Sequence, residues 1–263
     1  MEDFFDDLRK REEGVYRGLK DILGDSYSIA TDLVDLYTVV LNASLKPVCK
    51  LDDNNFQMPA LMHTLQWLKN EAISGVLSMM RGHISDASNF NRRALELSAF
   101  ISLMYKDKDS AERWMKAGVS KSAQDRYRSR FDAFKVVRAE LPAPLIEIYN
   151  RCCLDVHPSP FAVVKRASLD SDRTHRFSFF DLDDDDPRQP SFVMNFFNHV
   201  IYHVKIMEFL SQLFYPSGLF DSQAWMASFK PFLENTESRR IAFMPLIEEH
   251  LRKIDEEAEK ISG

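Results

Sequence analysis

The sequence has 263 residues and carries 34 lysine and arginine side chains against 40 aspartate and glutamate side chains, a formal net charge of −6. Apolar residues make up 45 % and charged residues 28 %, the balance of an ordinary globular protein with a sizeable core. Glycine accounts for only about 3 % against a typical value of about 7 %, which excludes most many-stranded sandwiches and barrels because their turns need glycine. Neither glycine-rich phosphate-binding pattern, G-x-G-x-x-G or G-x-x-x-x-G-K-[ST], occurs.

Nearly every long segment spaces its apolar side chains at a helical period. We therefore predict an all-α protein, an antiparallel bundle of about eight or nine helices that forms a single helical domain over residues 1–263. The predicted helices cover residues 4–23, 29–47, 59–80, 84–105, 111–116, 123–141, 145–156 and 191–214, and a last helical stretch runs from residue 221 to the end with breaks at Pro231 and Pro245.

One segment departs from the helical pattern. Residues 161–164 and 177–180 favour strands, and residues 183–186 form a run of four aspartates. That run lacks the ligand spacing of an EF-hand, so we expect it to be solvated. We interpret residues 161–190 as an insertion that forms a long loop or a short hairpin.

Targeting signals and cysteine usage point to the cytoplasm. Residues 1–7 are acidic and lack both the basic start and the apolar stretch of a secretory signal. The longest run without a charged residue, residues 189–204, is shorter than the about 20 apolar residues that a membrane-spanning helix needs. Three cysteines, Cys49, Cys152 and Cys153, without a C-x-x-C pattern are typical of reduced thiols. We expect a cytoplasmic protein with no membrane segment and no cofactor.

The most informative helix contains a single charge. Residues 94–105 are apolar on nearly every side, so this helix is expected at the centre of the bundle, and Glu96 is its only charged residue. A buried carboxylate must be paired or protonated. Arg92 and Arg93 precede Glu96 by four and three positions and lie within its reach on a helix. The pattern indicates either a structural ion pair or a carboxylate that holds an arginine or histidine facing a pocket.

A second candidate site lies at the end of the predicted helix 145–156. His157 directly precedes Pro158, which discourages further helix, so its imidazole lies where the helix dipole favours the protonated form. Arg151 lies six positions earlier. Two structural alternatives stay open: His157 packs under the proline-rich turn, or Arg151 pairs with Asp155.

Two weaker patterns involve histidines and arginines. His199 and His203 share one helix face, as ligands of a helical zinc site do, but the glutamate of H-E-x-x-H is absent; packing histidines are the alternative. Residues 121–138 are rich in basic side chains with aromatic residues between them, so the stretch is a candidate for phosphate binding, or else a solvated helix face. Its candidate phosphate ligands are Arg126, Arg128 and Arg130.

Two motifs together carry a family resemblance. The stretch Arg92-Arg93-Ala94-Leu95-Glu96-Leu97 is followed, about 60 residues later, by Tyr149-x-Arg151 and then Val156-His157-Pro158-Ser159. This pairing resembles uncharacterised bacterial all-helical proteins that are distantly similar to the HEPN (higher eukaryotes and prokaryotes nucleotide-binding) superfamily. The resemblance covers roughly residues 61–159. HEPN proteins are antiparallel helical bundles and are often dimeric; many are metal-independent ribonucleases with an R-x(4–6)-H motif, and others bind nucleotides or RNA without catalysis.

The resemblance implies a function and a partner. Arg151 and His157 match the R-x(4–6)-H motif, so His157 would act as acid and base on a ribose 2′-hydroxyl and Arg151 would stabilise the charged phosphate. Arg92, Arg93 and Glu96 would support them. We therefore expect a homo-oligomeric protein that acts on RNA or a nucleotide. If the protein is a catalyst, we expect it to be a ribonuclease. The alternatives are a noncatalytic helical interaction module, which binds itself or a protein partner, and a metal-dependent enzyme that uses His199 and His203.

Overall fold

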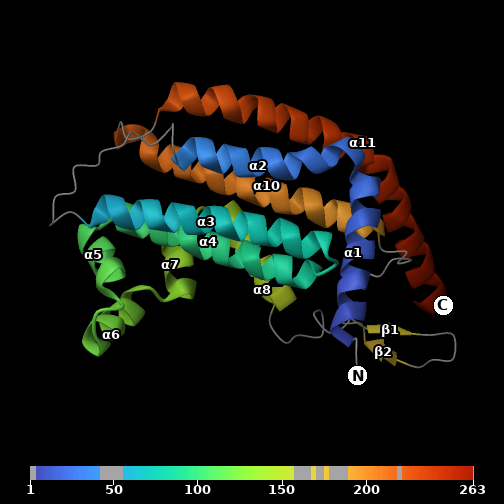
Figure 1. Ribbon diagram of the computed structural model, residues 1–263, viewed down its shortest axis with the longest axis horizontal. Coiled ribbons are helices and arrows are strands. Elements are labelled where there is room, and N and C mark those ends of the chain that lie inside the picture. The colour runs from blue at the N-terminus through green and yellow to red at the C-terminus, as the bar shows by residue number, and fades with distance from the viewer. Residues whose placement is uncertain are drawn as a thin grey trace.

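The computed structural model describes residues 4–41, 56–156, 167–169, 175–177, 189–217 and 221–262. The described chain is almost entirely helical, and the predicted all-α bundle is confirmed (Figure 1). Its helices are α1 (Phe4–Leu23), η1 (Gly24–Tyr27), α2 (Ser28–Val39), α3 (Gln57–Met80), α4 (Ile84–Lys106), α5 (Lys108–Lys116), α6 (Lys121–Arg130), α7 (Ala133–Glu140), α8 (Ala143–Val156), α10 (Gln189–Phe214), η3 (Tyr215–Ser217) and α11 (Ser222–Ser262).

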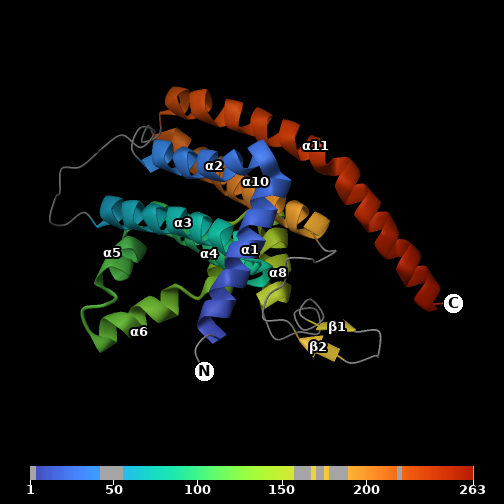
Figure 2. The same ribbon diagram turned by 45° about the vertical axis from the view of Figure 1, so that its right-hand side comes forward.

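The centre of the bundle is the antiparallel pair α3 and α4, as the apolar stretch 94–105 predicts. Helix α4 packs against α3, α7, α8 and α10, and its side chains from Leu97 to Met104 are all buried. Helix α10 crosses behind α2 and beside the α3–α4 pair, and α11 covers α2 and α10 (Figures 1 and 2). Helix α4 therefore lies between α3, α7, α8 and α10.

The turn between α3 and α4 falls at Arg81–Gly82, where the sequence predicts an interruption. Gly82 has a φ of 85°, a left-handed conformation that costs glycine little because it has no Cβ. The Gly82 N–H donates to the Met79 carbonyl over 2.8 Å, and the His83 N–H donates to the Ser78 carbonyl over 2.9 Å. These bonds close the end of α3 and reverse the chain into α4.

The predicted single helix over residues 123–141 is wrong: the chain breaks at Phe131–Asp132 into α6 and α7. The Asp132 carboxylate caps α7 by accepting from the Lys135 N–H. The Phe131 ring stacks on Tyr127 and packs edge-on against Trp114 and Phe100. Burial of this ring stabilises the break, so tertiary packing rather than helix propensity decides the boundary.

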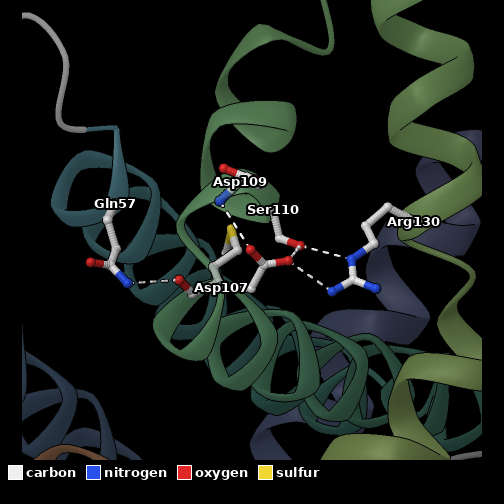
Figure 3. Close-up of polar contacts among 6 residues, drawn as sticks. Gln57, Asp107, Asp109, Ser110 and Arg130 are labelled. Atoms are coloured by element: carbon white, nitrogen blue, oxygen red, sulfur yellow. Dashed lines mark hydrogen bonds and ion pairs between the residues drawn. The ribbon is translucent and has the colours of Figure 1, made fainter.

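Polar contacts fix the start of α5 and the end of α6 to the end of α4 (Figure 3). Asp107 caps α5 by accepting from the Asp109 N–H, and its other oxygen accepts from the Ser110 hydroxyl over 2.6 Å. Arg130 of α6 donates to Ser110 Oγ and to Asp107 Oδ2, each over 2.8 Å. Gln57, at the start of α3, donates to the Met104 and Tyr105 carbonyls at the end of α4. The projecting arm of α5 and α6 is thus anchored at one corner of the bundle.

Helix α11 runs without interruption through Pro231 and Pro245, so the predicted breaks at these residues are wrong. A proline inside a helix removes one backbone hydrogen bond and bends the axis. Packing of α11 on α2 and α10, through buried side chains such as Trp225, Phe229 and Phe232, outweighs that loss.

A two-stranded hairpin lies within the predicted insertion at residues 161–190. Strand β1 (Ala167–Leu169) pairs antiparallel with β2 (His175–Phe177), and Ser168 lies opposite Arg176. The described residues of the insertion thus include a short pair of antiparallel strands, as the predicted hairpin requires. The β-prone segment 161–164 and the aspartate run 183–186 lie outside the described residues, as does Cys49.

Candidate functional site

Glu96 lies in the interior of the bundle and has the partners that the sequence calls for. Its side chain is 18 % exposed, and its Oε1 is 3.9 Å from Arg92 Nε. Tyr149 of α8 donates its hydroxyl hydrogen to the same oxygen over 3.2 Å. Burial raises the pKa of Glu96, while Arg92, Tyr149 and Arg93 oppose that rise. The carboxylate therefore links α4 to α8.

Arg93 has a different partner from the one expected. Its guanidinium lies 2.8 Å from Oε1 of Glu71 on α3, and Glu71 is only 3 % exposed. Burial raises the pKa of Glu71, and the neighbouring Arg93 opposes this rise. Glu71 Oε2 has no hydrogen-bond partner within the part of the chain that the structure describes. Glu71 is missed by local reasoning because its partner is on another helix, although it falls on the apolar face that Leu68 and Ala72 mark.

The two ion pairs form one cluster, which we call the ionic cluster: Glu71, Arg92, Arg93, Glu96 and Tyr149. The charges balance, and the members come from α3, α4 and α8. Burial also raises the pKa of the adjacent Cys153 thiol, which keeps it a poor nucleophile. The arrangement favours the structural interpretation of Glu96, a clamp that fixes three helices.

Arg151 lies on another face of α8. Two residues after Tyr149, its side chain is turned by about 200° around the helix axis. It lines a hollow of about 170 Å³ between α4, α8 and α10, which we call the α4–α8–α10 hollow. The structure therefore brings Glu96 together with Tyr149 and Arg92, and separates this group from Arg151. The polar side chains of the hollow are Ser88, Asn91, Arg151, Asp155, Asn195, Asn198 and Tyr202.

The polar contacts inside the hollow leave Arg151 accessible. Ser88 donates its hydroxyl hydrogen to Asp155 Oδ2 over 3.0 Å. The Arg151 side chain is 64 % exposed, and it lies 3.8 Å from a carboxylate oxygen of Glu147, which is 77 % exposed. Burial raises the pKa of Tyr202, and the nearby Arg151 acts in the opposite direction. Arg151 is thus a cation at the rim of a polar recess.

Asn91 is the unsatisfied member of the hollow. It is 6 % exposed, and its Oδ1 has no hydrogen-bond partner among the described residues. Asn195, across the hollow, instead donates its amide to the Ser191 carbonyl over 2.7 Å. A buried polar atom without a partner is costly, so Asn91 identifies a place where a ligand can supply the missing bond. His157, which follows the last residue of α8, lies outside the described residues.

The three candidate phosphate ligands on α6 do not form one patch. Arg130 is bound to Asp107 and Ser110 (Figure 3). Arg126 lines a depression together with two basic and two acidic side chains of α5: Arg113, Lys116, Asp109 and Glu112. Arg128 is exposed. The basic stretch therefore divides between an anchoring contact and mixed-charge surface.

His199 and His203 are both fully buried and face each other, with ring centroids 4.6 Å apart. His199 Nε2 lies 3.1 Å from the Ala72 carbonyl, so this nitrogen carries the hydrogen. The Tyr37 hydroxyl lies 2.6 Å from His203 Nδ1. Across the described ranges, no group of three or more histidine, cysteine, aspartate or glutamate side chains is arranged to hold a metal ion. The contacts favour packing histidines.

Acid should destabilise the protein through this pair. Burial lowers the pKa of His199 from 6.5 to about 4 and that of His203 well below 6.5. Between pH 6.5 and pH 4, the His199 imidazole takes up a proton in the unfolded chain but stays neutral in the folded protein. Lowering the pH from 6.5 to 4 should therefore reduce the free energy of unfolding by about 3 kcal/mol for His199 alone.

The measurement is urea unfolding across this pH range, followed by circular dichroism, for the wild type and for His199→Leu. Glu71 and Glu96 act in the opposite direction, because a carboxyl group with a raised pKa stabilises the fold as the pH falls. They are common to both proteins, so the difference between the two pH profiles isolates the histidine. Parallel profiles would contradict the prediction.

Comparison with known proteins identifies no relative, so the function has to be inferred from the geometry of the candidate site. No protein-family model, curated protein or solved structure matches this chain. None of the described helices combines the length and the apolar character needed to cross a membrane.

Proposed function

We propose that the protein binds RNA or a nucleotide at the α4–α8–α10 hollow. The observation that carries the proposal is the accessible guanidinium of Arg151 at the rim of a recess lined by amide and hydroxyl groups. A guanidinium matches the geometry of a phosphate oxygen pair. Asparagine amides and hydroxyl groups are the side chains that read base edges and ribose hydroxyls.

The charge of the chain supports a local site rather than a general affinity for nucleic acid. A net charge of −6 opposes nonspecific attraction to phosphates. On α6, Arg130 is already bound to Asp107, and Arg126 lines a depression of mixed charge. Arg151 is thus the cation best placed to contact a phosphate beside a recess.

If the protein also cleaves RNA, the proposed site includes His157 as a catalytic residue. In a metal-independent cleavage, His157 would take the proton of a ribose 2′-hydroxyl as its oxygen attacks the adjacent phosphorus. The bond from phosphorus to the 5′-oxygen would break, and the leaving oxygen would take up the proton that His157 has received. Arg151 would stabilise the negative charge that builds on the phosphate oxygens. The products would be a 2′,3′-cyclic phosphate and a free 5′-hydroxyl.

Arg151→Ala should weaken RNA binding by about tenfold or more, because a charge-assisted contact to a phosphate is lost. The measurement is fluorescence anisotropy with a short fluorescein-labelled single-stranded RNA of mixed sequence. Arg17→Ala is the matched control, since Arg17 is also exposed and pairs with Glu13 at i−4 over 3.7 Å, but on α1. This control should bind RNA as the wild type does.

Two results would count against the proposal. If the wild type binds neither RNA nor a mononucleotide, the proposal falls and the noncatalytic interaction module stands in its place. If the Arg17 and Arg151 variants lose affinity equally, the contact is not specific to the hollow. For catalysis, RNA is incubated with the wild type and with His157→Ala; equal background cleavage by both removes the ribonuclease and leaves binding.

A further inference from the structure

The side chains that line the α4–α8–α10 hollow indicate which chemical group of the ligand binds there. Asn91 is buried to more than nine-tenths, and its Oδ1 lacks a partner within the described chain. Its near neighbour on the same helix, Asn89, is satisfied, because its Oδ1 accepts from Arg92 over 3.2 Å. Of these two asparagines, Asn91 is the one whose Oδ1 has no partner among the described residues, and it lines the recess.

We infer that the hollow is a nucleobase subsite that takes an unpaired adenine, read by Asn91. The inference rests on the proposed function and names the part of the ligand that enters the recess. The amide of asparagine matches adenine in two bonds: Oδ1 accepts from the exocyclic amino group, and Nδ2 donates to ring N7. Uracil lacks both that amino group and ring N7, and it meets an amide only through its N3–H and O4, which lie on a different edge of the ring.

The size of the hollow fits a base and not a whole nucleotide. Pockets for drug-sized ligands measure about 300–1,000 Å³, whereas this hollow measures about 170 Å³. A planar base enters, and its ribose and phosphate stay at the rim. Arg151 occupies that rim with most of its side chain exposed, so it meets the phosphate while Asn91 meets the base edge.

The walls of the hollow suit the faces of an aromatic ring. Met79, Ile84 and Met194 line it together with the ring of Tyr202. Thioether groups pack favourably on aromatic rings, and a tyrosine ring is a surface on which a base stacks. The hollow thus combines apolar walls for the faces of a base with an amide for its edge.

The test compares labelled oligo(A) with oligo(U) by fluorescence anisotropy, with adenosine and uridine monophosphate as competitors. The wild type should bind oligo(A) about tenfold more tightly than oligo(U). Effective competition by adenosine monophosphate assigns the free nucleotide as the source of the base. Tight binding of oligo(A) that the mononucleotide does not displace assigns single-stranded RNA.

Two substitutions separate a ligand-reading role from a structural one. Asn91→Leu, which removes an unsatisfied polar group, should abolish the preference for adenine while the melting temperature stays the same or rises by about 2–4 °C. Asn91→Ala opens the recess instead of filling it and should lose the same preference, so blockage by leucine does not explain the loss. Asn89→Leu is the control: it removes a satisfied amide, lowers the melting temperature slightly and keeps the preference.

The outcomes distinguish this inference from the function on which it rests. Equal binding of oligo(A) and oligo(U), with affinity still dependent on Arg151, overturns the adenine subsite and leaves RNA binding intact. A preference for adenine that survives both Asn91 substitutions also overturns it. Failure of every RNA and nucleotide to bind overturns the proposed function as well.

Discussion

Replacing Gly75 with alanine should lower the free energy of unfolding by about 3 kcal/mol, as overpacking a rigid interior does. A Cβ at this position would lie 2.3 Å from His199 Cε1 and 3.0 Å from its Nδ1. The imidazole has little freedom to retreat, because it is fully buried and its Nε2 donates to the Ala72 carbonyl. Helices α3 and α10 approach each other through this glycine.

The control for this substitution is Gly18→Ala on α1. No atom lies within 4 Å of a Cβ built there, so this change should stabilise the protein by about 0.5–1 kcal/mol through the helix preference of alanine. Urea unfolding of both variants, followed by circular dichroism, gives the two free energies. The penalty at Gly75 should largely disappear in a His199→Ala background. If it persists there, contact with His199 is not its cause.

Removing the positive charge of Arg93 should cost about 2 kcal/mol at neutral pH, because Glu71 is then left buried without its partner; the cost is smaller than for a fully buried pair because the Arg93 side chain is 40 % exposed. Arg93→Met keeps much of the side-chain length and removes the contact to Glu71 Oε1 at 2.8 Å. Burial already raises the pKa of Glu71, and loss of Arg93 raises it further. The folded variant then holds a proton that the unfolded chain does not, so the penalty should shrink as the pH falls through the raised pKa.

The same unfolding measurement, at neutral pH and in mild acid, tests this prediction. Adding Glu71→Gln to Arg93→Met should restore most of the stability, because the buried charge is gone. Arg9→Met is the surface control, since Arg9 is 69 % exposed and pairs with Asp6 and Glu13; it should change the free energy by less than about 0.5 kcal/mol. An Arg93 penalty that is as small, or that does not depend on pH, would contradict a buried ion pair.

Local sequence pattern predicts the features that depend on one helix. The pair Arg92–Glu96 follows from i, i+4 spacing, and the turn at Gly82 follows from a residue that tolerates positive φ. The contact between Arg93 and Glu71 depends on how α3 lies against α4, which spacing along one helix does not encode. The same holds for Pro231, where packing on neighbouring helices keeps α11 continuous.

In the candidate site, too, some residues follow from the sequence pattern and others only from the packing of the helices. The pattern around residues 149–157 identifies Arg151, whereas Asn91 carries no sequence signal, since its unsatisfied state exists only once α4, α8 and α10 surround it. The separation of Glu96 from Arg151 does follow from helix geometry, because Tyr149 and Arg151 are two positions apart and must point to different sides of α8. A ligand that contacts the side of α8 on which Arg151 lies therefore does not contact Glu96.

The two prolines inside α11 determine the direction in which that helix curves. A proline bends a helix away from its own side, because its ring pushes against the carbonyl of the preceding turn. Pro231 and Pro245 are about four turns apart and so lie on nearly the same side of the axis. Their bends add instead of cancelling, which makes α11 an arc rather than a zigzag (Figure 1). The first half of α11 therefore packs on α2 and α10, whereas its C-terminal turns lead away from the other helices (Figure 2).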